Sequence, residues 1–351
     1  MRIVLADPPA YTPPYDHELA AGLARAGAEV ELVTSRFRFG TVAEAAGYRR
    51  SELFYPVSSR LFRRSRLRLP LKLLEHPLGM ARLARRRADV VHVQWLSLPQ
   101  LDRHLLRLRA PAVFTAHDLL PRRTAARRAL WLDLFARFAR VVVHSDRGRQ
   151  TLVDLGVDPV RIRIIPMPVF RADPGRRDDG RTVLFSGVIR PYKGLGDALA
   201  ALERLGDARL IVAGDPAMPL DGYRGRAQGQ VEWRLGYLPE DEVDRAHAEA
   251  TVAVFPYRPE IDQSAALLRA LGAGVPAVVY DVGGLAEPVR SFGAGRVVPA
   301  GDVGALTDAL RELLEDGDAL AAARAGAERA RDSLTWEAAA EAHLALYREI
   351  V

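Results

Sequence analysis

TVLFSGVIRPYKGLGDALAAL, residues 182–202, runs from a short apolar segment through a glycine and two cations into an amphipathic segment. The first part has the β-branched and aromatic side chains of a buried strand, and the last part has the spacing of a helix. Gly187, Arg190 and Lys193 lie between them. A strand that leads into a helix is the repeating unit of parallel sheets, so this stretch predicts an α/β fold.

Lys193 is unusual because almost all of the cationic residues of this chain are arginines. The sequence has 50 Lys+Arg, of which only Lys72 and Lys193 are lysines, and it has no asparagine. A GC-rich gene explains that bias. A lysine beside glycines at a strand-to-helix turn offers a compact charge and backbone N–H groups to a phosphate. We therefore predict a phosphate site here, and a solvated loop lysine is the alternative.

Length and composition limit the classes of protein. A chain of 351 residues, 49% hydrophobic and 27% charged, is expected to hold about two folded domains. The absence of cysteine excludes disulfides, thiolate metal sites and cysteine nucleophiles. The first apolar run, residues 3–6, is too short for a signal peptide, and no apolar stretch reaches 18 residues. We expect a cytoplasmic protein.

Strand-like and helix-like segments alternate along both halves of the chain. Strands are expected at 2–6, 30–34, 89–95, 112–116, 140–145 and 161–166, and again at 182–187, 208–214, 250–256, 276–281 and 295–299. Helical patterns include 16–26, 123–138, 194–205, 240–250, 302–315 and 335–350. Such alternation predicts two doubly wound domains whose ligands bind in the cleft at the carboxyl ends of the strands.

The boundary between the domains is expected in MPVFRADPGRRDDGR, residues 167–181, which is rich in proline, glycine and charge. We therefore assign residues 1–168 to an N-terminal domain and residues 169–334 to a C-terminal domain. Residues 335–351 form a last helix that packs on the N-terminal domain.

Several linked motifs resemble retaining glycosyltransferases of family 4, which have the GT-B fold of two Rossmann-like domains facing a cleft. The motifs are VDLGVDPVRIRIIPMPVF (153–170), LFSGVIRPYKGLGDALAAL (184–202), LIVAGD (210–215), GYLPEDEVDRAHAEATVAVFPY (236–257), GAGVPAVVYDVGGLAEPV (272–289) and TWEAAAEAHLALY (335–347). They follow the family's order over nearly the whole chain. The resemblance implies that the N-terminal domain binds the acceptor and the C-terminal domain binds the nucleotide sugar. In that family the last helix crosses back to the N-terminal domain.

The resemblance implies a donor site made of matched positions in the second half. Arg190 and Lys193, next to Gly187, are implied to clamp the donor diphosphate, which needs neither a metal nor a cofactor. Backbone groups of Gly236, Tyr237 and Leu238 are implied to face the nucleotide base. The N–H groups of Ser264, Ala265 and Ala266 are implied to point at the diphosphate from the start of a helix.

The chain departs from the family at its pair of glutamates. Aligning GAGVP places Arg269 at the second glutamate, which contacts the ribose, and Ile261 at the first, which contacts the transferred sugar. Glu260 or Asp262 can still reach that sugar, or be solvated in the loop. Arg269 can contact phosphate or face solvent.

His117, in TAHDLLP (115–121), occupies the position of a family histidine that contacts the donor sugar near the reacting centre. A hydrogen-bonded histidine at the end of a strand is the alternative. The function implied is transfer of a sugar, with retention, from a nucleoside-diphosphate sugar to a hydroxyl of a glycan, lipid or small molecule. A non-catalytic carbohydrate- or nucleotide-binding protein and a sugar-nucleotide epimerase are the alternatives.

Two further patterns suggest other functions. Asp316-Gly317-Asp318 matches the Asp-x-Asp metal string of another glycosyltransferase fold, but it lies between two helical patterns, so we interpret it as a turn and expect no metal site. The arginine-rich residues 60–87 and 122–138 are interpreted as solvated faces, with peripheral contact to an anionic membrane on its inner face as the alternative. Nucleic acid is not an expected partner, because the basic regions lack interleaved aromatics.

Overall fold

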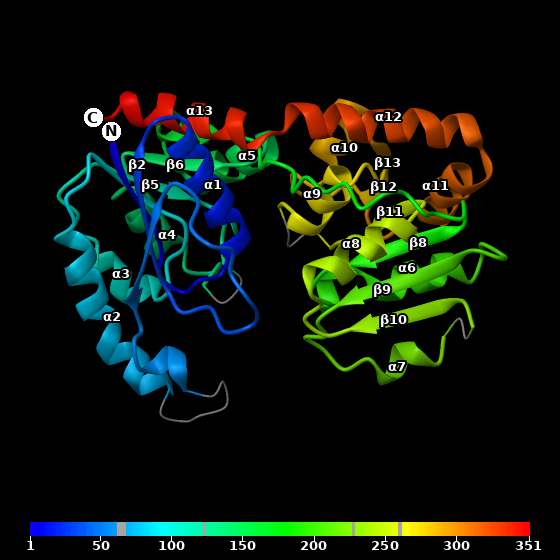
Figure 1. Cartoon of the computed structure of the whole chain (residues 1–351), viewed down its shortest axis with the longest axis horizontal. Coiled ribbons are helices and arrows are strands. Elements are labelled where there is room, and N and C mark those ends of the chain that lie inside the picture. Colours follow the sequence, from blue (N-terminus) through cyan, green and yellow to red (C-terminus); the bar gives the residue numbers. More distant parts are fainter. Residues whose placement is uncertain (62–67, 122–123, 227–228, 259–261) are drawn as a thin grey trace. The chain divides into compact units, whose positions relative to one another are not determined.

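The computed structural model describes residues 1–61, 68–121, 124–226, 229–258 and 262–351. Two compact units result: unit 1 comprises Met1–Pro166 and Trp336–Val351, and unit 2 comprises Met167–Thr335. Each unit has one parallel sheet with helices packed against it (Figure 1). The predicted α/β class with two Rossmann-like sheets is confirmed.

The sheet of unit 1 has seven strands in the order β3-β2-β1-β4-β5-β6-β7. The strands are β1 (Arg2–Asp7), β2 (Glu29–Ser35), β3 (Arg49–Phe54), β4 (Val90–Val93), β5 (Ala112–Thr115), β6 (Arg140–Val143) and β7 (Ile162–Ile164). The chain reverses its direction of travel across the sheet between β1 and β4. Ligands of open parallel sheets bind at such a point, outside the carboxyl ends of the strands.

The helices of unit 1 are α1 (Pro13–Arg25), α2 (Arg68–Ala84), α3 (Pro99–Leu105), α4 (Arg128–Phe135), α5 (Asp146–Leu155) and α13 (Trp336–Arg348). The last helix returns to this unit and packs on α1, where a Cβ atom added to Gly22 would lie 3.2 Å from the carbonyl oxygen of Trp336. Its Tyr347 hydroxyl lies 2.6 Å from Nδ1 of the buried His92 on β4.

The sheet of unit 2 has six strands in the order β10-β9-β8-β11-β12-β13. The strands are β8 (Thr182–Ser186), β9 (Arg209–Gly214), β10 (Val231–Leu235), β11 (Val252–Phe255), β12 (Ala277–Tyr280) and β13 (Gly295–Val298). The helices are α6 (Leu195–Leu202), α7 (Asp221–Arg224), α8 (Glu240–Glu249), α9 (Ala265–Gly272), α10 (Ala286–Phe292), α11 (Val303–Glu315) and α12 (Gly317–Ser333). Here the reversal lies between β8 and β11.

Two strands that the sequence patterns did not predict, β3 and β10, lie at the edges of their sheets. Both are only partly buried, so their sequences RRSELF and VEWRL lack the continuous apolar run of an interior strand. The helix expected at 123–138 is shorter, because α4 begins at Arg128.

Asp316 accepts hydrogen bonds from the N–H groups of Asp318 (2.9 Å) and Ala319 (3.1 Å) and so caps α12. The Asp-x-Asp string is therefore a turn between two helices, as predicted. Among the described residues, no helix has the length and apolar character needed to cross a membrane.

Candidate functional site

The two loops at the reversal point of unit 2 touch each other. Gly194, at φ 71°, lies so close to the loop after β11 that an added Cβ would fall 1.9 Å from the carbonyl oxygen of Pro256. The N–H of Arg258 donates to the carbonyl of Tyr192 at 2.8 Å. Only glycine combines that backbone conformation with that approach, so the position fixes the loop after β8 against β11.

Lys193 is held inside this contact. It is 8% exposed, and its Nζ atom lies 5.0 Å from the centre of the Tyr257 ring. A Cβ atom added to Gly187, at φ 93°, would lie 2.9 Å from Lys193 Nζ and 3.2 Å from Ala266 Cβ. The structure therefore brings Gly187 and Lys193 together with the first turn of α9, which is distant from them in the sequence.

The ammonium group of Lys193 is poorly compensated. Burial lowers its pKa to about 8, the phenol of Tyr192 opposes that shift, and the charge of Arg190 adds to it. No described carboxylate lies within ion-pair distance of Lys193. A buried cation without an anion is costly, and a bound anion removes that cost.

The start of α9 adds backbone donors to the same place. Ser264 caps this helix by accepting from the N–H of Leu267 at 3.3 Å, and its hydroxyl also lies 3.1 Å from that of Tyr257. The N–H groups of Ala265 and Ala266 belong to the first turn, which no intrahelical carbonyl satisfies. Helix N-termini and ammonium groups both favour a phosphate group.

Arg190 lies next to this group, on the surface. Its backbone carbonyl accepts from the N–H of Lys193 at 3.0 Å, and its charge contributes to the lowered pKa of Lys193. Gly187, Arg190, Lys193, Ser264, Ala265 and Ala266 thus gather at the carboxyl ends of β8 and β11.

The contacts of Arg269 differ from the phosphate or solvent that the sequence led us to expect. Its guanidinium pairs with Glu240, at the start of α8, and lies 5.7 Å from the centre of the Phe170 ring. Tyr237 belongs to the same group, because burial and then the Glu240 carboxylate raise its pKa. The loop of Gly236, Tyr237 and Leu238 therefore lies beside Arg269. Glu240 is the first residue of the helical pattern expected at 240–250.

Of the two acidic candidates in the loop before α9, the structure describes Asp262. Glu260 lies outside the described residues. The Oδ1 atom of Asp262 accepts from the N–H of Gly284 at 2.8 Å, and Gln263 donates to the carbonyl of Gly284 at 3.1 Å. Asp262 thus supports the turn before α10, and its assignment to the sugar stays a prediction.

His117, in unit 1, follows β5 and lies in an aromatic cluster near the reversal point of that sheet. Trp95 stacks on its ring at 5.2 Å, and Tyr15 meets it edge-on at 4.7 Å. Its Nε2 atom lies 2.9 Å from the side-chain oxygen of Gln94, and its Nδ1 atom lies 3.4 Å from His144 Nε2. Burial, followed by the charge of His144, holds the pKa of His117 well below its usual range.

The hydrogen bonds of this cluster indicate which ring nitrogens of His144 and His117 carry a proton. The Nδ1–H of His144 donates to the carbonyl of Ile165 at 2.8 Å, and burial lowers the His144 pKa to about 4, so its Nε2 accepts from His117. His117 Nε2 is then an acceptor itself, which calls for the NH₂ group of Gln94 rather than its oxygen. Exchanging the two ends of that amide also gives the otherwise unbonded Gln94 Nε2 a partner.

Two buried carboxyl groups at the end of β1 were missed in the sequence. Asp7 is 0% and Asp16 1% exposed, and Asp7 Oδ2 accepts from the N–H groups of Tyr11 (2.7 Å) and Thr12 (3.2 Å). Burial raises the pKa of both carboxyl groups, and the charge of Asp7 raises that of Asp16 further, well above its usual value. The hydrogen bonds that Asp7 accepts from Tyr11 and Thr12 organise the loop after β1.

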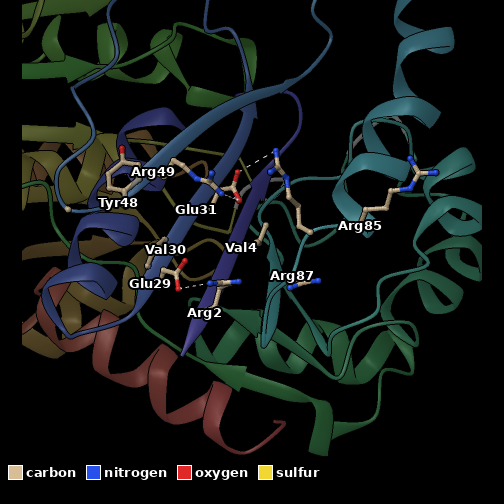
Figure 2. A pocket seen from close by; sticks show the side chains of 11 residues that line it. Arg2, Val4, Glu29, Val30, Glu31, Tyr48, Arg49, Arg85 and Arg87 are labelled. Atoms are coloured by element: carbon tan, nitrogen blue, oxygen red, sulfur yellow. Dashed lines mark hydrogen bonds and ion pairs between the residues drawn. The ribbon is translucent and has the colours of Figure 1, made fainter.

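A pocket of about 740 Å³ lies at the opposite, amino side of the sheet of unit 1 (Figure 2). Its arginines are largely matched by acids: Glu29 pairs with Arg2 at 3.0 Å, and Glu31 pairs with Arg49 at 2.7 Å and Arg86 at 3.5 Å. We place no substrate here, because ligands of parallel sheets bind at the carboxyl ends of the strands.

Two family models match consecutive parts of the chain. The model described as Glycosyltransferase Family 4 matches residues 15–170, and the model described as Glycosyl transferases group 1 matches residues 180–316. The predicted resemblance to glycosyltransferases of family 4 is therefore confirmed.

Curated relatives of this chain act on different acceptors by name. The D-inositol 3-phosphate glycosyltransferase of Mycobacterium marinum is 31% identical over 307 residues, which cover 75% of this chain and 64% of the relative. The 2-deoxystreptamine glucosyltransferase of Streptomyces kanamyceticus is 28% identical over 277 residues, which cover 74% and 70%. The chain thus matches less than two thirds of the length of the inositol-phosphate relative.

Solved structures share the fold at low identity. Sucrose-phosphate synthase from Thermosynechococcus elongatus has a TM-score of 0.77 at 21% identity, covering 99% of this chain and 98% of that protein. Anabaena HepE, solved with UDP and glucose, has a TM-score of 0.74 at 16% identity, covering 99% and 100%. The predicted GT-B fold is confirmed.

The burial of Lys193 predicts a gain in stability when its charge is removed. The folded pKa of about 8 lies below the ordinary 10.5, so the unfolded chain binds the proton more tightly and burial lowers the free energy of unfolding below pH 8. Lys193→Met should therefore raise the free energy of unfolding at pH 7 by on the order of 2 kcal/mol. Urea denaturation at pH 7 and at pH 10 measures it.

The gain should shrink between pH 8 and pH 10.5, where the buried wild-type amine loses its proton. Lys72→Met is the matched control, because it removes the other lysine of the chain from a less buried place. A Lys193→Met variant less stable than the wild type at pH 7 contradicts the proposed cost of the buried charge.

Proposed function

We propose that this chain is a retaining glycosyltransferase that moves a sugar from a nucleoside-diphosphate sugar to an acceptor hydroxyl. Unit 2 binds the donor and unit 1 the acceptor. The observation that carries the proposal is the position of the Lys193 ammonium beside Gly187 and Ala266, at the carboxyl end of β8. Relatives named as glycosyltransferases and the UDP-glucose complex of HepE support it.

The site supplies positive charge where the reaction develops negative charge. As the bond between the sugar C1 and the diphosphate oxygen breaks, Lys193, Arg190 and the N–H groups at the start of α9 stabilise the departing diphosphate. We propose that these groups suffice without a metal ion. Glu260, Asp262 and, from unit 1, His117 are assigned to the transferred sugar, and Gly236, Tyr237 and Leu238 to the base.

The acceptor hydroxyl attacks C1 on the face that the diphosphate leaves, which retains the configuration. A new bond forms between C1 and the acceptor oxygen, and the acceptor proton passes to the departing diphosphate oxygen. No side-chain base is required for this step. A neutral His117 agrees with such a mechanism, since it acts by hydrogen bonding and contact rather than as a charged group.

The first test is a thermal-shift screen with uridine, guanosine, thymidine and adenosine diphosphates. One of them should raise the melting temperature, because a ligand at about 100 times its Kd stabilises the folded state by about 2.7 kcal/mol. Lys193→Ala should abolish the shift. Arg85→Met, which changes a cation on the amino side of unit 1, should leave it intact.

The corresponding sugar nucleotide then separates enzyme from binding protein. We expect slow hydrolysis of the sugar nucleotide, or transfer of its sugar, with retention of the anomeric configuration in the product as observed by NMR. The rate should be the same with and without EDTA. Binding without turnover indicates a non-catalytic protein, and a new sugar nucleotide without acceptor indicates an epimerase. An inverted product, or full activity of Lys193→Ala, contradicts the proposal.

The surface of α2 favours a second property, peripheral binding to an anionic membrane. Leu74 and Leu78, which are 71% and 60% exposed, lie one turn apart on the helix, and the exposed Arg82 continues the same face. Exposed leucines beside arginines match a surface with an apolar interior and anionic headgroups. We therefore propose that α2 lies on such a membrane.

Flotation with lipid vesicles tests this surface. The wild type should float with vesicles that contain phosphatidylglycerol and stay behind with phosphatidylcholine alone, because the arginines need anionic headgroups. Replacing Leu74 and Leu78 by glutamate should abolish flotation. Val160→Glu, a change at an equally exposed apolar residue of unit 1, is the matched control. A wild type that ignores anionic vesicles contradicts the proposal.

A further inference from the structure

Two helices of unit 2, α8 and α9, begin at the carboxyl side of the parallel sheet, because each follows a strand (Figure 1). The start of α9 lies beside Gly187 and the Lys193 ammonium. From Leu267 to its end, every residue of α9 is buried except Arg269. The accessible face of this helix therefore consists of its first turn and of Arg269.

Arg269 lies one helical turn beyond Ala265, on the same face of α9. The two residues are about 6 Å apart along the helix axis. In a nucleoside diphosphate, the ribose is the group that directly follows the phosphates. A nucleotide whose phosphates bind at the start of α9 and whose base faces residues 236–238 therefore places its ribose beside Arg269.

The side chain of Arg269 is held by two contacts. Its guanidinium lies 5.7 Å from the centre of the Phe170 ring, and it pairs with the Oε1 atom of Glu240, the first residue of α8. The side chain of Arg269 is 20% exposed, whereas that of Glu240 is 70% exposed. The ion pair thus holds an accessible carboxylate in one place next to the open face of α9.

The second carboxylate oxygen of Glu240 can receive a ligand. Arg269 is the partner of Glu240 Oε1, and no residue that the structure describes donates to Glu240 Oε2. Helix α9 has no acidic residue of its own, so α8 supplies the carboxylate at this face. A carboxylate in an ion pair only accepts hydrogen bonds, so its ligand must be a donor group.

Tyr237 lies on the other side of this carboxylate. Its side chain is 57% exposed, and its pKa is raised by burial and then by the charge of Glu240, against the opposing charge of Arg269. An accessible aromatic ring is a stacking surface for a planar base. The contacts therefore run from the start of α9 through Arg269 and Glu240 to Tyr237, in the order of phosphate, ribose and base.

We infer that Glu240, positioned by Arg269, accepts a hydrogen bond from a ribose hydroxyl group of the donor nucleotide. The hydroxyl groups are the donors of a nucleotide that lie nearest to its phosphates, and carboxylates bind them in other doubly wound domains. The inference rests on the proposed function, since it assumes a nucleoside diphosphate at Lys193. It adds a preference of the site for ribose over deoxyribose.

Calorimetric titration with uridine, guanosine and adenosine diphosphates, each compared with its 2′-deoxy and 3′-deoxy forms, tests this contact. For the nucleotide that binds, loss of one of the two hydroxyls should raise the Kd about tenfold or more, as for the loss of a hydrogen bond to a charged group. In Glu240→Ala, the ratio of the deoxy Kd to the ribo Kd should fall to about 1, because the partner of the hydroxyl is gone.

Asp241→Ala is the matched control. Asp241 lies in the same first turn of α8, its side chain is 74% exposed, and it pairs with Arg245 instead of Arg269. This change should leave the ratio as in the wild type. Arg269→Met should lower the ratio, since Glu240 loses the partner that positions it, whereas a general loss of structure weakens the ribo and deoxy forms alike.

Equal binding of the ribo and both deoxy forms by the wild type overturns the inference. A ratio that Glu240→Ala leaves unchanged, or that Asp241→Ala lowers, overturns it as well. A chain that binds a nucleoside diphosphate without this preference, or binds thymidine diphosphate alone, loses this inference and keeps the proposed donor site. A chain that binds no nucleoside diphosphate loses both.

Discussion

The backbone contact between the loops after β8 and β11 is the constraint on which the proposed donor site depends. Gly194 lies against the carbonyl of Pro256, and Arg258 donates to Tyr192 across the same contact. This closeness leaves Lys193 only 8% exposed, with its ammonium beside Gly187 and the start of α9. Burial then makes the cation costly and gives a bound diphosphate its advantage.

Unit 1 uses the same topology with different chemistry. Its sheet also reverses next to its first strand, and polar groups again gather at the carboxyl ends. Burial lowers the pKa of His117 and raises the pKa of Asp7 and Asp16, which favours the neutral form of each group. Unit 2 instead buries a cation, Lys193.

The sequence predicted the features that depend on local pattern. Interior strands such as β1 and β8 are continuous apolar runs, and the position of Lys193 between β8 and α6 follows from the same local pattern. The role of Lys193 with phosphate stays a prediction. The edge strands β3 and β10 were missed because one face of each meets solvent and their patterns are weak.

Features made by pairs that are distant along the chain could not be predicted. The ion pair of Arg269 with Glu240 joins two helices. The hydrogen bonds between Asp102 and His76 and between His76 and Tyr55 join three segments. Each residue is unremarkable in its own stretch of sequence. Their roles arise only from the register of the strands and the packing of the helices, which no local pattern contains.

The central claim is that the Lys193 ammonium receives the donor diphosphate, and proton uptake on binding tests it most directly. Calorimetry at pH 8 in buffers of different ionisation enthalpy should show uptake of up to about half a proton, because a site with a pKa of about 8 becomes fully charged when the anion binds. The terminal phosphate is already deprotonated at that pH. Binding of the nucleoside diphosphate to the wild type without proton uptake would contradict the account.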